Sequence, residues 1–127
     1  MQPTDADRQL YDRARTASAA AYAPYSDYPV GAALLTADGT VVTGVNVENA
    51  SYGLTCCAER NAVFAAVAAG HRAFEAVAVH AQVGAASPCG ACLQVLAEFG
   101  ELRVIWRRDA ELAAAPLSEL LPERFRL

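Results

Sequence analysis

The chain has four cysteines, and they fall in two short clusters that constrain its fold more than any other feature. The clusters read Cys56-Cys57-Ala58-Glu59-Arg60 and Pro88-Cys89-Gly90-Ala91-Cys92. The spacing Cys89-x-x-Cys92 lets a turn that enters a helix offer two thiolates to one metal ion. Cys57 can supply a third thiolate from a separate helix start. We therefore expect a fold that brings two distant helix starts together.

The number of ligands predicts what kind of metal site this is. Three protein ligands leave one position of a tetrahedral zinc open for water, as in catalytic sites, whereas a fourth protein ligand would close it. Cys56 is the only spare cysteine, and as the neighbour of Cys57 it can hardly reach the same ion without distorting the backbone. We therefore expect one Zn2+ per chain, bound by Cys57, Cys89 and Cys92.

The residues around these ligands match a signature of the zinc-dependent deaminases. That signature has a ligand two residues before a glutamate, followed later by Pro-Cys-x-x-Cys, and an all-cysteine ligand set is a known form of it. A lone Cys-x-x-Cys would fit a redox pair or a structural zinc knuckle equally well. Here Glu59 stands in the glutamate position and is expected to transfer protons. Arg60 is expected to donate to the cysteine sulfurs, because three thiolates more than neutralise Zn2+.

Length and charge limit the class of protein and its partners. A chain of 127 residues predicts one domain, here a zinc-dependent deaminase domain over residues 1–127. The net charge of −4 and the absence of a basic run longer than Arg107-Arg108 argue against a polyanion partner. A small neutral substrate is expected, with no nucleic acid and no membrane partner. Cysteines reserved for a metal suit a reducing cytoplasm.

Hydrophobic periodicity predicts an α/β fold. Helices are predicted over 4–22, 57–69 and 89–99, and strands over 30–36, 40–47, 73–81 and 102–106. Residues 110–115 fit an edge strand or a loop, and 118–121 fit a helical turn. This order of elements indicates a mixed sheet covered by helices. The helix over 57–69 has almost no polar face, which predicts burial on all sides. The surplus of alanine hints at apolar surface buried between subunits.

Beyond the zinc motifs, the sequence resembles the small, homotetrameric cytidine deaminases over residues 25–125. The resemblance is carried by the segments Pro24–Leu34, Asn46–Gly53 and Gln94–Leu96 and by Leu120-Leu121-Pro122-x-x-Phe125. It implies a three-layer cytidine-deaminase-like fold with a mixed five-stranded sheet covered by helices. It also implies hydrolytic deamination of cytidine and 2′-deoxycytidine in pyrimidine salvage, by a homotetramer whose sites are shared between subunits.

The same resemblance implies roles for residues outside the zinc motifs. Asn46 and Glu48 would bind the ribose hydroxyls, as alternating residues on one strand face can do. Tyr28 would pack on the nucleoside, and Ala58 would contact the pyrimidine. Ala50 and Tyr52 would face the sugar from adjoining subunits. Phe125 would stack on the base across the tetramer.

Three positions depart from the usual family pattern. Tyr28 stands where phenylalanine is common, and its hydroxyl needs a partner if buried. Cys56 replaces an aliphatic residue, and Leu93 replaces an arginine. Other readings stay open: a deaminase for another aminopyrimidine, such as nucleosides of the blasticidin S type or free cytosine, a polynucleotide-editing deaminase, a structural zinc protein, or a redox dithiol protein.

Overall fold

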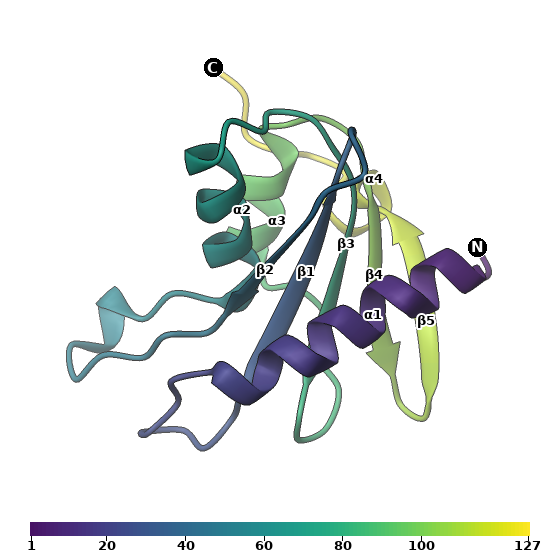
Figure 1. Cartoon of the computed structure of the whole chain (residues 1–127). Helices are drawn as coiled ribbons and strands as arrows, with labels where there is room; N and C mark the ends of the chain where they lie inside the picture. The colour runs from purple at the N-terminus through teal and green to yellow at the C-terminus, as the bar shows by residue number, and fades with distance from the viewer.

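A computed structural model of residues 1–127 shows one five-stranded sheet with helices on both of its faces (Figure 1). The strands are β1 (Val30–Thr36), β2 (Val41–Val45), β3 (Phe74–Ala81), β4 (Arg103–Arg108) and β5 (Glu111–Pro116). The α-helices are α1 (Asp5–Ala17), α2 (Ala58–Ala68), α3 (Gly90–Ala97) and α4 (Leu117–Leu120), and short 3-10 turns η1 (Ser18–Ala20) and η2 (Tyr52–Leu54) complete the chain.

The sheet is mixed, as the sequence predicts. Its strand order is β2-β1-β3-β4-β5. β1 pairs antiparallel with both β2 and β3, β3 pairs parallel with β4, and β4 pairs antiparallel with β5. A parallel pair needs a crossover connection, and α3 lies in that connection between β3 and β4. Residues 110–115, which the sequence left open, form most of the edge strand β5.

Two apolar cores lie on opposite faces of the sheet. Alternation along β3 directs Val77 and Val79 into the core beneath α2 and α3, and Ala76 and Ala78 into the core beneath α1. Figure 1 shows α1 crossing one face of the sheet while α2 and α3 stand on the other. The three-layer architecture is therefore confirmed. None of the helices has the length and hydrophobicity needed to cross a bilayer.

The first helix begins where its capping residues predict. The Thr4 hydroxyl accepts a hydrogen bond from the Asp7 backbone N–H, and the Asp7 carboxylate accepts one from the Thr4 backbone N–H. This reciprocal pair is a capping box. α1 ends at Ala17 and continues only as the 3-10 turn Ser18–Ala20, so the helix is shorter than the predicted span. Residues beyond the turn already extend toward β1.

The expectation that α2 is buried on all sides is wrong within this chain. Phe64 is 51% exposed, although the preceding residues of α2, Ala62 and Val63, are buried. An apolar groove between α2 and α3 is lined mainly by Val63, Phe64, Val67, Ala68, Val95 and Phe99. The sequence shows that this helix is apolar on all sides. It does not show whether the surface that covers the helix belongs to the same chain.

Candidate metal centre and substrate site

The three predicted ligands come together at the starts of two helices. Cys57 is the N-cap residue of α2, and Cys89 is the N-cap residue of α3, one turn before Cys92. The three sulfurs lie within 4.8 Å of one another, and those of Cys57 and Cys89 are 3.9 Å apart. Two sulfurs each about 2.3 Å from a tetrahedral zinc lie about 3.8 Å apart. The cluster therefore fits zinc, and Cys56 is not part of it.

The surroundings favour thiolate at Cys57. Hydrogen bonds from the Cys92 thiol and from Arg60 lower the pKa of Cys57 to about 5, although its burial acts the other way. The pKa of Cys92 is raised, because its thiol donates to Cys57 and its side chain is fully buried. The Nη2 atom of Arg60 lies 3.4 Å from the Cys57 sulfur. That contact raises the pKa of Arg60, which stays a cation beside the ligands.

Glu59 lies in the first turn of α2, two residues after Cys57, and only 4% of it is exposed. Burial raises the pKa of this carboxyl to about 7, and the negative charge on Cys57 acts in the same direction. A carboxyl group whose pKa is close to neutrality can both accept and return a proton under physiological conditions. The position and the pKa of Glu59 thus suit proton transfer beside a metal.

Asn46 and Glu48 lie just beyond the end of β2 at Val45. They flank Val47, which forms isolated β-bridges with Tyr22 and Cys56, so the chain remains paired there although the regular strand has ended. Asn46 is buried, and its side chain holds the neighbouring loop. Its Oδ1 accepts a hydrogen bond from the Val30 backbone at 2.9 Å, and its Nδ2 donates to the Tyr28 carbonyl at 2.9 Å.

The Glu48 carboxylate is held by the turn before β1. Its Oε1 accepts hydrogen bonds from the backbone N–H groups of Tyr25 at 2.9 Å and Ser26 at 3.1 Å, and its Oε2 accepts one from the Ser26 hydroxyl. The Ser26 hydroxyl bond, with the backbone bonds, holds the pKa of Glu48 below its usual range. Sequence reasoning did not identify Ser26. The local feature that could have identified it is a serine turn, in which the Ser26 hydroxyl accepts a hydrogen bond from the Tyr28 backbone N–H.

Tyr28 is half-buried, and Ala58 is buried. The Tyr28 hydroxyl, absent from a phenylalanine, donates to the Ala85 carbonyl at 3.4 Å. Ala85 belongs to the loop that leads to Cys89. This hydrogen bond therefore joins the turn before β1 to the loop that precedes a metal ligand. Ala58 is fully buried as the first residue of α2.

The other three predicted substrate residues lie on the surface of this chain. Ala50 is exposed, Tyr52 is 77% exposed, and Phe125 is 72% exposed. The Tyr52 ring packs edge-on against Tyr25, with ring centres 6.2 Å apart. A single chain therefore does not bury these side chains together with the cysteine cluster.

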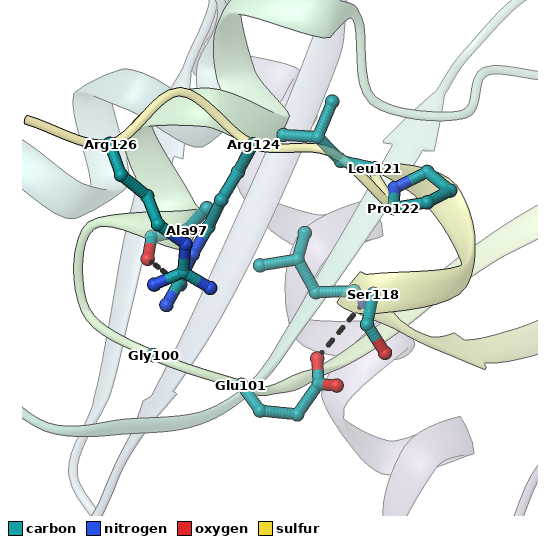
Figure 2. Close-up of a pocket in the computed structure, with 9 residues that line it drawn as sticks. Ala97, Gly100, Glu101, Ser118, Leu121, Pro122, Arg124 and Arg126 are labelled. Carbon is teal, nitrogen blue, oxygen red and sulfur yellow. Dashed lines mark hydrogen bonds between the residues drawn. The ribbon is translucent and has the colours of Figure 1, made fainter.

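The tail that carries Phe125 is nevertheless fixed in place. The Gln94 side chain accepts a hydrogen bond from the Phe125 backbone N–H at 2.9 Å and donates to its carbonyl at 3.1 Å. Figure 2 shows the adjoining pocket, where Arg124 donates to the Ala97 carbonyl at the end of α3. The backbone of the tail is thus bound to α3, while the ring of Phe125 is presented outward.

Comparison with known proteins gives a consistent result. A family model described as the cytidine and deoxycytidylate deaminase zinc-binding region matches residues 4–107. A cytidine deaminase of Sporosarcina psychrophila is 46% identical over 121 residues, covering 92% of this chain and 89% of that protein. A cytidine deaminase of Halalkalibacterium halodurans is 48% identical over 124 residues, covering 94% of each chain.

Solved structures show the same architecture. The crystal structure of cytidine deaminase from Burkholderia pseudomallei superposes with a TM-score of 0.86 at 48% identity, covering 93% of this chain and 98% of that chain. The cytidine deaminase structure from Mycobacterium tuberculosis also gives a TM-score of 0.86, at 43% identity, covering 98% of this chain and 99% of that chain.

Proposed function

Because the chain belongs to the cytidine and deoxycytidylate deaminase family, we propose that it catalyses the zinc-dependent hydrolysis of cytidine and 2′-deoxycytidine. The products are uridine or 2′-deoxyuridine and ammonia, a reaction of pyrimidine salvage. The observation that carries this proposal is a buried carboxyl, Glu59, with a pKa of about 7, next to a cluster of three cysteine sulfurs.

Each residue of the metal centre has a role in this proposal. Cys57, Cys89 and Cys92 would hold zinc, which when bound lowers the pKa of a coordinated water toward about 7. Glu59 would accept the first proton of the attacking water and deliver it to N3 of the pyrimidine. It would then take the second proton from the hydroxyl now on C4 and give it to the amino group as the C4–N bond breaks, so that ammonia leaves and a carbonyl oxygen remains on C4. Burial keeps the pKa of the Glu59 carboxyl near the value at which it can both accept and donate a proton.

Arg60 balances the charge of the ligands. Three thiolates and Zn2+ sum to one net negative charge, which weakens the attraction of the metal for its water. The Arg60 guanidinium, 3.4 Å from the Cys57 sulfur, supplies a compensating positive charge. Its Nε is buried and has no hydrogen-bond partner.

We assign the sugar to Asn46 and Glu48. Their contacts with the loop leave hydrogen-bonding capacity unused: the amide of Asn46 has a second N–H, and each oxygen of the Glu48 carboxylate has further lone pairs. A ribose hydroxyl can accept a hydrogen bond from the Asn46 amide and donate one to the Glu48 carboxylate. Tyr28 would then pack on the nucleoside, and the segment around Ala58 would contact the pyrimidine.

We propose that the active form is a homotetramer in which neighbouring chains complete each site. Support comes from the apolar groove between α2 and α3, whose Phe64 side chain is 51% exposed in one chain. A large exposed apolar patch is typical of an interaction surface. Ala50, Tyr52 and Phe125 would reach the site of an adjoining chain. The 127 residues would act as one domain in the cytoplasm, where thiols stay reduced.

The first experiment is a deamination assay on the purified protein, with zinc content measured on the same sample. Absorbance is followed with cytidine, 2′-deoxycytidine, cytosine and CMP. We expect loss of the cytosine chromophore with both nucleosides, at about one zinc per chain. Zinc without turnover of either nucleoside would overturn the substrate assignment and direct attention to another aminopyrimidine. Protein that binds no zinc would overturn the proposed metal centre.

A further inference from the structure

The start of α2 has no capping side chain. Its N-cap residue is the ligand Cys57, and no side-chain cap hydrogen bond is present there. By contrast, α1 is capped by Thr4, and in α3 the Cys89 sulfur accepts from the Cys92 backbone. Helix starts without a capping side chain are less stable. Another contact must therefore fix the turn that carries Glu59.

Strand β2 supplies one such contact at Gly44. A Cβ atom added to Gly44 would lie 2.4 Å from the Ala62 nitrogen and 2.5 Å from the Ala58 oxygen. Both are backbone atoms of α2, so they cannot move aside unless the helix moves. The first turn of α2 thus rests directly on the strand, with only a hydrogen atom between the two backbones.

Asn61 supplies a second contact to the same turn. Its Nδ2 donates to the Val45 carbonyl at 2.8 Å and to the Cys56 carbonyl at 3.4 Å. The first bond joins α2 to the residue after Gly44, and the second joins it to the peptide that leads into Cys57. Backbone bonds between Val47 and Cys56, both 3.0 Å long, close this arrangement.

We propose that Gly44 and Asn61 form a docking seat that positions the metal ligand Cys57 and the proton-transfer residue Glu59. Cys57 and Glu59 come from α2, whereas the other two ligands come from α3. The geometry of the centre therefore depends on how closely α2 approaches the sheet. This inference rests on the proposed function, and both residues act by holding α2 against β2, not through the substrate.

The test compares Gly44→Ala and Asn61→Ala with Gly31→Ala. Gly31 is a matched control, because an added Cβ there would lie 2.1 Å from the Ala14 oxygen and 2.6 Å from the Ser18 nitrogen, against α1 on the other face of the sheet. All three variants should lower the thermal midpoint. Zinc affinity is measured by competition with a chelator, cobalt(II)-substituted protein is examined by absorption, and kcat and KM are measured separately.

We expect Gly44→Ala and Asn61→Ala to weaken zinc binding or lower kcat about 10–100-fold, the usual effect of losing support behind metal ligands. The thiolate-to-cobalt bands should shift in both, and KM should change little. Gly31→Ala should keep the wild-type zinc affinity, cobalt spectrum and kcat. If Gly44→Ala does not fold, Asn61→Ala decides the question.

Two results would overturn the docking seat. One is wild-type zinc affinity, cobalt spectrum and kcat in Asn61→Ala. The other is an equal loss of zinc affinity in Gly31→Ala, which would mean that any backbone clash disturbs the centre. Zinc affinity and cobalt spectra need no substrate. A wild-type protein that fails to deaminate cytidine would therefore overturn the proposed function while leaving the seat testable.

Discussion

Glu59 is the residue whose surroundings differ most from those of a free carboxyl group. It is 4% exposed, and burial raises its pKa to about 7. Glutamine has nearly the same shape and no charge, so Glu59→Gln should preserve the fold and the bound zinc. Turnover should fall by at least about 10²–10⁴-fold, because no group remains to carry protons. The measurements are kcat for cytidine and zinc content of the same preparation.

The control for that substitution is Glu75→Gln, which changes an exposed glutamate on β3. It should leave both kcat and zinc content at wild-type values. If Glu59→Gln turned over cytidine at the normal rate while holding zinc, another group would have to move the protons, and the mechanism given above would be wrong.

At the scale of single elements, α1 depends on one buried carboxylate. Asp7 completes the capping box with Thr4 and forms an ion pair with Arg103 of β4. Asp7→Ala removes both interactions, and we expect the free energy of unfolding to fall by about 1–2 kcal/mol at pH 7. Urea unfolding measures this loss. Asp5→Ala, an exposed residue in the same turn, is the control and should cost less.

The stability due to Asp7 should also depend on pH. Burial raises its pKa, but hydrogen bonds and charge from Arg103, with the bonds from Thr4, outweigh burial and hold the pKa below 3.8. A carboxyl with a lowered pKa in the folded state stabilises that state above its unfolded pKa. The difference between wild type and Asp7→Ala should therefore persist at pH 5 and shrink as the pH falls below about 4. A constant difference down to pH 3 would contradict this account.

Elements specified by local patterns could be predicted from the sequence, and contacts between distant segments could not. Hydrophobic periodicity and cysteine spacing placed the starts of α1, α2 and α3, and with them the cysteine cluster that the structure brings together. The predicted strand over 40–47 ran past the end of β2 at Val45, because strand periodicity does not show where a strand ends. The contact of Gly44 with α2, and the bonds from Asn61 of α2 to the Val45 and Cys56 carbonyls, involve backbone atoms, and no residue pattern encodes them.

At the scale of the whole molecule, the position of Phe125 makes a prediction about mixed oligomers. Its backbone is bound to Gln94, and its ring is 72% exposed. If the Phe125 ring completes the site of another chain, each site takes Glu59 from one chain and Phe125 from a neighbour. Phe125→Ala and Glu59→Gln then affect two different chains of the same site. Joint refolding of the two variants should restore about a quarter of the wild-type activity under random mixing in a symmetric oligomer.

The comparison for this experiment is the same pair of variants refolded separately and then combined just before the assay. Sizing of each sample establishes that both have the same oligomeric state. Activity of the jointly refolded sample equal to the mean of the separate samples would mean that each chain builds its site alone. Phe125 would then have no role in a neighbouring site.

The three sulfurs of the cluster also differ in their access to solvent. Cys89 is exposed, Cys57 is partly buried, and Cys92 is fully buried. Alkylating agents and oxidants therefore meet the cluster from one side, and oxidation follows exposure and thiolate character. During storage, oxidation should therefore reach Cys89, which is exposed, and Cys57, whose pKa is lowered, before it reaches Cys92. The protein should then lose its metal while Cys92 is still reduced inside an intact core, and a reductant or added zinc should slow that loss.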